Sequence, residues 1–172
     1  MKSNKTFSSI FLPYLHLVIC DAREFANWSA AWRYSEKENA VARTVRGKKC
    51  STAKELFNEF GAALQFPYYF GENWDAFNDC ITDLEWIPGN EYLLFIPNAE
   101  KVLANADRDF RIFIDLLHKA GKEWAESQED HPDFPRPSKP FHVVFHCEPD
   151  SKNKLLNRLN EVNAEFSEIT ID

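Results

Sequence analysis

Hydrophobic and polar residues follow one another along the chain in short patterns that favour strands and helices in turn. Apolar runs predict strands over residues 14–20, 40–45, 92–96, 141–147 and 166–171. Apolar residues spaced three and four apart predict helices after residue 21 and over residues 52–64, 74–84, 107–126 and 151–162. Because strands alternate with helices between residues 40 and 147, we expect an α/β fold with a small parallel sheet.

Several residues mark where the predicted helices begin and where the chain turns. Asp21 is placed to cap the first helix, and Thr52 with Glu55 has the spacing of a capping box. Residues 35–39 are polar and predict a loop. Residues 131–140 hold four prolines and predict an irregular connector.

The stretch FPYYFGENWDAFNDCITDL, residues 66–84, contains a helix with two contrasting faces. The apolar face is formed by Trp74, Phe77, Ile81 and Leu84. The other face carries three carboxylates one turn apart, Asp75, Asp79 and Asp83. Like charges at this spacing repel by about 0.2–0.5 kcal/mol per pair, and only Asp75 gains from the helix macrodipole. One interpretation is a solvated face; the other is a surface that meets a cationic partner.

The residues before this helix favour the second interpretation. Residues 67–71 form a rigid turn rich in aromatic side chains, and Asn73 is a good N-cap. Tyr and Trp offer a large contact area at a small entropic cost, so they are frequent in protein interfaces. Aromatic side chains beside an acidic helix are therefore typical of a protein-binding surface.

Composition narrows the class of protein further. The chain has 172 residues, 44% of them hydrophobic, and is expected to form a single domain, 1–172, that buries about 70% of its unfolded surface. The net charge of −7 argues against a general nucleic-acid binder or a binder of anionic membranes, and it suits a basic partner.

The cysteines and the N-terminus bear on where the protein works. Cys20, Cys50, Cys80 and Cys147 lack a zinc-site spacing and are expected to be reduced and mostly buried in a cytoplasmic protein, with a disulfide as the open alternative.

An apolar run over residues 7–19 follows two lysines, as in a secretory signal. Polar residues dilute this run and Ile19 occupies the cleavage-site position, so we expect a buried strand instead.

Motifs for catalysis or metal binding are weak. The sequence has no Gly-rich phosphate loop, no HExxH and no GxSxG. His142 and His146 share one strand face, but without a nearby third ligand a structural role is favoured. Glu72, Asp75 and Asp79 also suit a carboxylate-dependent metal hydrolase, although no cationic residue is interleaved to hold a phosphate. We therefore predict no catalytic residue, no metal and no cofactor.

Residues 68–80, YYFGENWDAFNDC, resemble the signature of the barstar family, the intracellular inhibitors of barnase-type ribonucleases. That signature is an aromatic turn, then Gly-Glu-Asn, then Asp-Ala and Asp-Cys on a helix. The resemblance covers about residues 40–147 and implies a barstar-like core there. Residues 1–39 and 148–172 would then be additions at the two ends of the core.

The resemblance also implies a function. In the family, this helix and the turn before it close the nuclease active site, and their acidic side chains take the place of substrate phosphates. The positions that match family contacts are Tyr69, Gly71, Asn73, Asp75 and Asp79. Asp79 would be the central anchor, since a carboxylate accepts two donors from an arginine. The full predicted set of partner-binding residues adds Asn78, Asp83 and Trp86.

The chain departs from the family pattern at several of these positions. Asn78 stands where an aromatic residue is common, Trp86 is shifted in spacing, and residues 116–119 lack the acidic contact of the archetype. These departures suggest a different ribonuclease or another kind of partner. We predict a cytoplasmic inhibitor or immunity protein, not an enzyme, that binds a basic ribonuclease. The alternative is a barstar-like interaction module without a nuclease partner.

Overall fold

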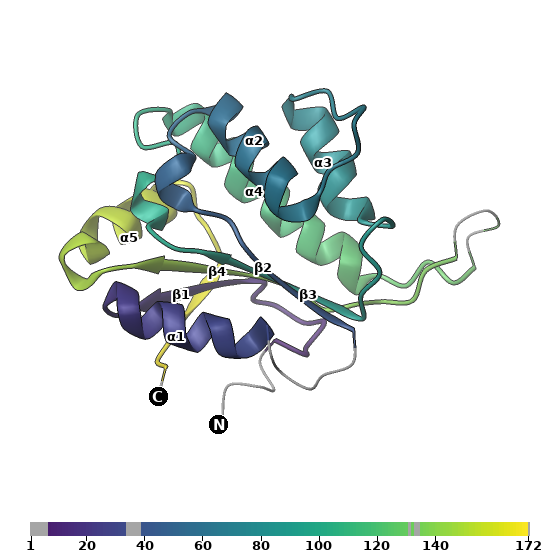
Figure 1. Ribbon diagram of the computed structural model, residues 1–172, viewed down its shortest axis with the longest axis horizontal. Helices are drawn as coiled ribbons and strands as arrows, with labels where there is room; N and C mark the ends of the chain where they lie inside the picture. The colour runs from purple at the N-terminus through teal and green to yellow at the C-terminus, as the bar shows by residue number, and fades with distance from the viewer. Residues whose placement is uncertain (1–6, 34–38, 131, 133–134, 172) are drawn as a thin grey trace.

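The computed structural model describes residues 7–33, 39–130, 132 and 135–171. Its centre is a five-stranded sheet in which all neighbouring strands are parallel, so the predicted α/β fold with a parallel sheet is confirmed. The strands are β1 (Leu15–Ile19), β2 (Ala40–Thr44), β3 (Glu91–Ile96), β4 (Phe141–Cys147) and β5 (Phe166–Ile169). Their order across the sheet is β2-β3-β4-β1-β5 (Figure 1).

Helices cover both faces of this sheet. They are α1 (Ala22–Arg33), α2 (Ala53–Leu64), α3 (Trp74–Asp83), α4 (Asp107–Ala125) and α5 (Lys152–Glu161). Helix α1 lies on one face, whereas α2, α3 and α4 lie together on the other (Figure 1). Helix α5 packs into the same hydrophobic cluster as α2, α3 and α4 through Leu155 and Leu159. Among the described residues, none of the helices is long and apolar enough to cross a lipid bilayer.

The predicted helix starts are found in the structure. Asp21 Oδ1 accepts hydrogen bonds of 2.9 Å from the backbone N–H groups of Arg23 and Glu24, which caps α1. Thr52 and Glu55 form the predicted capping box of α2. The loop expected over residues 35–39 lies outside the described residues, apart from Asn39.

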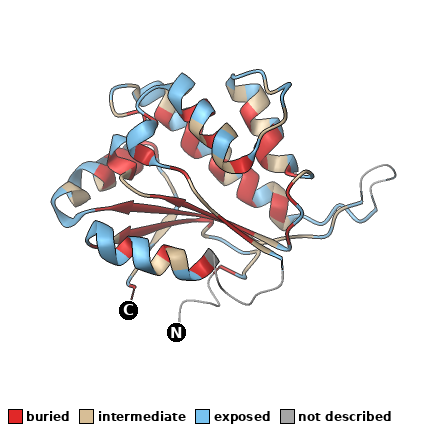
Figure 2. Ribbon diagram, in the orientation of Figure 1, coloured by how far each residue is buried: buried red, intermediate tan, exposed pale blue. Residues whose placement is uncertain are grey.

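Two hydrophobic clusters flank the sheet, and its inner strands β1, β3 and β4 are largely buried between them (Figure 2). Strand β4 shows how one strand serves both clusters. Phe141, Val143 and Phe145 belong to the larger cluster under α2, α3 and α4, whereas Val144 belongs to the smaller cluster under α1. Strand β4 is covered on both faces, and accordingly all of its residues are apolar except two histidines. Both histidines form hydrogen bonds within the protein.

Residues on either side of the range 40–147 join the same sheet. Strand β1 pairs with β4 on one side and with β5 on the other. The buried strand expected in the N-terminal apolar run is thus confirmed for Leu15–Ile19. The first part of the run differs, because Phe11 and Leu12 are exposed in the turn before β1. Strand β5 is also shorter than predicted and ends at Ile169.

Candidate functional site

Helix α3 has the two faces that its sequence predicts. Asn73 caps its start, with Oδ1 accepting from the Ala76 N–H at 2.9 Å. On the inner face, Phe77 and Ile81 are fully buried. Leu84 follows the last turn in the left-handed conformation, with φ of 48°, and its buried side chain anchors that end. The apolar face therefore fixes which way the opposite face points.

The three carboxylates of that opposite face, Asp75, Asp79 and Asp83, are all exposed. The ion pairs found among the described residues join Arg46 to Glu59, Lys119 to Glu123 and Lys152 to Glu168, and none includes the three aspartates. Asp79 accepts one long hydrogen bond, 3.4 Å, from the amide of its neighbour Asn78. The carboxylates thus form an acidic face, Asp75–Asp79–Asp83, that is open to a partner.

The turn before α3 presents two tyrosines to solvent. Tyr68 is fully exposed and Tyr69 is 67% exposed, and their rings meet edge to face at 5.6 Å. Phe66 and Phe70 point the other way and pack against the main core. The Phe70 N–H donates to the Pro67 carbonyl at 2.9 Å, which closes the turn. Aromatic side chains on the inner side therefore hold the tyrosines out.

Gly71 and Glu72 connect this aromatic turn to the helix. The left-handed residue is Glu72, with φ of 49°, and not Gly71. Gly71 leaves room for the cap, because a Cβ there would lie 3.0 Å from Nδ2 of Asn73 and that side chain would have to shift slightly. That nitrogen donates to the Gly71 carbonyl at 3.2 Å, so the turn and the helix cap are held together.

Two tryptophans near the acidic face are held by the fold. Trp86 is half-buried, and its Nε1 donates to the Leu64 carbonyl at 2.8 Å. Trp74 donates to Asp109 Oδ1 at 3.2 Å, which ties α3 to the first turn of α4. The donor group of Trp86 is therefore already used, and only part of its ring remains for the predicted partner contact.

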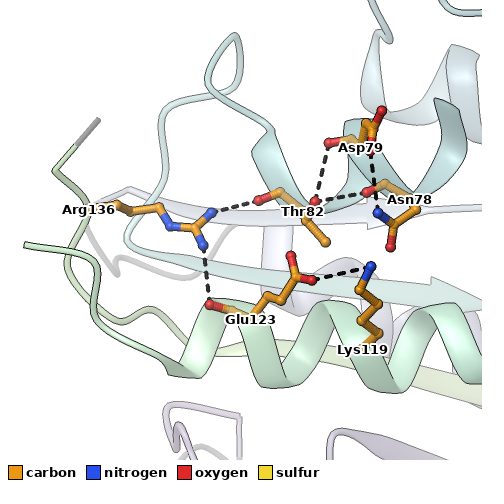
Figure 3. A network of polar contacts seen from close by, with 6 residues as sticks. All are labelled: Asn78, Asp79, Thr82, Lys119, Glu123 and Arg136. Atoms are coloured by element: carbon orange, nitrogen blue, oxygen red, sulfur yellow. Dashed lines mark hydrogen bonds and ion pairs between the residues drawn. The ribbon is translucent and has the colours of Figure 1, made fainter. Parts of the chain in front are cut away.

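The end of α3 carries a polar network that joins it to α4 (Figure 3). Asn78 is half-buried, and its Oδ1 has no hydrogen-bond partner in the described structure. Thr82 donates from its hydroxyl to the Asn78 carbonyl at 2.9 Å. Arg136 donates to the Thr82 carbonyl at 2.6 Å and to the Glu123 carbonyl at 3.2 Å. Sequence reasoning missed Arg136, since its proline-rich surroundings predict only a connector.

The buried histidines under α1 have defined partners. His142 Nε2 faces the Ser9 carbonyl at 2.7 Å, so this nitrogen carries the proton. His142 Nδ1 then accepts from Nε2 of His16 at 2.9 Å, and His16 Nδ1 accepts from the hydroxyl of Ser167 at 2.8 Å. This chain of neutral rings crosses β4, β1 and β5. Burial, and secondarily the neighbouring His142, lowers the pKa of His16 to about 3.

These contacts favour the structural interpretation of the histidines. His146 does not meet His142; it stacks on Phe25 at 4.1 Å and its Nε2 faces the Cys20 carbonyl at 3.1 Å. In the described ranges no three His, Cys, Asp or Glu side chains are placed to hold a metal ion.

The four cysteines are free and buried, as expected. Burial raises the pKa of Cys80 to about 11 and that of Cys50 to about 12, with nearby carboxylates adding to both shifts. Such thiols are almost entirely protonated near neutral pH and are poor nucleophiles.

Comparison with solved structures shows where the fold recurs. The chain aligns with part of a Drosophila ORC structure bound to GC-rich DNA and Cdc6, with a TM-score of 0.56 and 10% identity over 97% of this chain and 26% of the other. A second Drosophila ORC structure, bound to DNA, gives 0.54 and 11% over 91% and 25%. The chain spans about a quarter of these proteins, and at such identity the likeness concerns the fold alone.

Comparison by sequence is more specific. A search of curated proteins finds no match. The family model described as Barstar (barnase inhibitor) matches residues 40–146, well over half of the 172 residues. The matched region begins at β2, ends in β4 and contains the aromatic turn and α3. The chain therefore belongs to the barstar family.

Proposed function

We propose that this protein inhibits a basic ribonuclease by covering its active site with the acidic face of α3 and the tyrosines of the preceding turn. The observation that carries the proposal is the state of Asp75, Asp79 and Asp83. All three are exposed, and no described lysine or arginine pairs with them. The carboxylates repel one another, so a cationic partner that neutralises them would stabilise the helix.

The chemistry of the two surfaces is complementary. A ribonuclease active site holds cationic side chains that bind phosphates, and a carboxylate offers the same acceptor geometry to arginine. Asp79 lies in the middle of the row and is the proposed anchor, with Asp75 and Asp83 one turn on either side. The net charge of −7 would also speed the encounter with a basic enzyme.

The aromatic turn supplies the second part of the proposed interface. Tyr68 and Tyr69 already project from the surface, held by the inward-facing Phe66 and Phe70. Little ordering of the turn's backbone is then required on binding, which preserves affinity. In this proposal the protein has no catalytic role of its own and works in the cytoplasm, where its target is found. It excludes RNA from the ribonuclease by occupying the active site.

The ion pair between Lys119 and Glu123 shapes which ribonuclease would fit. These side chains lie on α4 beside the end of α3 (Figure 3). The pair is self-neutralised at 3.5 Å, so this part of the surface offers no net acidic contact. We therefore expect the partner to differ from barnase where it faces α4.

The test is RNA cleavage by barnase and by a panel of other basic ribonucleases, each titrated with the purified protein. Asp79→Ala should weaken inhibition of the cognate enzyme by about 30-fold or more, as for a hot-spot residue, an effect for which barnase–barstar is itself a reference case. Asp150→Ala, in the turn after β4, makes the same charge change away from α3 and should leave inhibition nearly unchanged.

Two results would contradict the proposal. If Asp79→Ala inhibits as well as the wild type while its circular dichroism is unchanged, Asp79 is not the anchor. If the protein inhibits no ribonuclease of the panel, the interaction module without a nuclease partner becomes the better assignment.

A further inference from the structure

The end of α3 has an electrostatic difficulty that its own residues do not relieve. Asp83 is the last helical residue, and the last turn contains no basic side chain. The C-terminal carbonyls of a helix carry a partial negative charge, so carboxylates close to them are unfavourable. Asp79 lies one turn earlier and adds to the same field. A positive charge supplied from elsewhere would therefore stabilise this end of the helix.

One local and two tertiary hydrogen bonds satisfy successive carbonyl groups at this end. The Cys80 carbonyl accepts from the Leu84 N–H at 3.3 Å, and the Ile81 carbonyl accepts from Nε1 of Trp124 at 2.9 Å. The Thr82 carbonyl accepts from Arg136 at 2.6 Å. Two of these three donors belong to side chains more than 40 residues away in the sequence, and only that of Arg136 is charged.

Arg136 also reaches the neighbouring helix. Its second Nη donates to the Glu123 carbonyl in the last turn of α4 at 3.2 Å, so one guanidinium bridges two helix ends (Figure 3). The guanidinium lies 4.1 Å above the ring of Trp124, where cation–π attraction favours it. Reciprocal backbone hydrogen bonds with Gln128, of 2.7 and 3.2 Å, hold the segment of the connector that carries Arg136.

The charges of Arg136 and Asp83 both act on the hydroxyl of Tyr92. Burial raises the pKa of Tyr92, whose hydroxyl donates to the Ile87 carbonyl at 2.9 Å. Among the smaller influences on the same hydroxyl, Arg136 lowers its pKa and Asp83 raises it. Both charges are thus within electrostatic range of a single buried group.

We propose that Arg136 is a positioning residue for the acidic face of α3. It fixes the last turn of the helix and supplies the positive charge that allows Asp79 and Asp83 to stand there unpaired. Its guanidinium points at backbone carbonyls instead of carboxylates, so the acidic side chains stay available. The importance of this role for inhibition rests on the proposed function, whereas the electrostatic coupling is a property of the free protein.

The experiment is a double-mutant cycle by urea unfolding at low ionic strength, without any nuclease. Arg136→Met should raise the unfolding equilibrium constant about tenfold or more, because charged hydrogen bonds are lost. In the background of Asp83→Asn, the same substitution should cost about two- to fivefold less, the range of a charge at a helix end. Amide hydrogen exchange should also quicken in the last turn of α3 and not in α2.

Arg111→Met is the matched control. Arg111 donates from Nη2 to the Glu161 carbonyl at 2.9 Å, at the end of α5, so it has the same kind of role at a helix without the acidic row. Its cost should be the same with Asp83 and with Asn at that position. If the change in the unfolding equilibrium constant caused by Arg136→Met is likewise the same in both backgrounds, the positioning role is wrong. Arg136 then only stabilises the fold.

A conservative variant keeps the test decisive if Arg136→Met fails to fold. Arg136→Lys retains the charge but cannot bridge two carbonyls with a planar fork. It should therefore lose part of the stability while keeping its attraction to Asp83, so the effect of Asp83→Asn should be about the same in the lysine variant as in the wild type, and added salt should change both effects alike. If added salt leaves the effect of Asp83→Asn unchanged in both backgrounds, the proposal is overturned. Neither outcome depends on whether a ribonuclease is the partner.

Discussion

Acid should destabilise this protein through its buried histidine chain, and replacement of His16 should reveal how much. His16 is fully buried and is held neutral between His142 and Ser167. The pKa of His16 falls to about 3 in the folded protein, against 6.5 for an unperturbed histidine. The neutral form is therefore favoured by folding. The stabilisation is fully present above pH 6.5 and is lost as the pH falls towards about 3.

The size of the effect follows from these two values. A histidine with a pKa of 6.5 unfolded and about 3 folded loses about 2 kcal/mol of stabilisation between pH 7 and pH 5. At pH 5 the unfolded chain has bound the proton, whereas the folded protein has not. His16→Gln removes this titration, so the free energy of unfolding of the variant should fall less steeply over the same interval.

The assay is urea unfolding, followed by tryptophan fluorescence, at pH 7, 6 and 5. His16→Gln should be less stable than the wild type at pH 7, because the hydrogen bonds to His142 and Ser167 are disturbed. The difference should then shrink by about 2 kcal/mol on going to pH 5. His118→Gln is the control. Burial lowers the pKa of His118, but Glu165 and Asp115 act in the opposite direction, so the difference in unfolding free energy from the wild type should change less with pH than for His16→Gln. If the difference in unfolding free energy between the wild type and His16→Gln is the same at pH 7 and pH 5, His16 is not held neutral as assigned.

Two further predictions concern the core and the cysteines. Phe77→Ala should lower the free energy of unfolding by about 3–5 kcal/mol in urea titration, because a fully buried ring in contact with Phe60 and Phe113 is lost; a cost below 1 kcal/mol would show that the inner face of α3 is loosely packed. A thiol reagent such as DTNB should react with Cys50 and Cys80 only as fast as the protein unfolds, since both are buried and their pKa values are raised; rapid labelling of the native protein would contradict this burial.

The sequence predicted local structure well wherever residues close together in the chain determine it. Asn73 and the pair of Thr52 and Glu55 begin their helices as expected, because capping depends on residues three apart. The exposure of Asp79 followed equally from helical spacing. The position of Glu72 in the left-handed region was not foreseen, because a glycine stands beside it and glycine is the usual residue there.

Long-range partners could not be predicted from local patterns. Nothing near Arg136 indicates that it reaches Thr82, 54 residues away, since the contact depends on how the connector folds back. Likewise the strand over Leu15–Ile19 was expected, but its place between β4 and β5 was not. The hydrogen bond between His16 and His142 depends on that place, so it was beyond the sequence as well.

The position of β1 makes the two ends of the chain interdependent. Leu15 lies opposite Val143 in one neighbouring strand and opposite Phe166 in the other. A chain trimmed to residue 40 would therefore leave β4 with a bare edge and β5 with no strand to pair with. The sheet cannot be completed until residues more than 120 positions apart have met, and such distant closure slows folding. During synthesis, β1 cannot pair with its neighbours until β4 and β5 have left the ribosome.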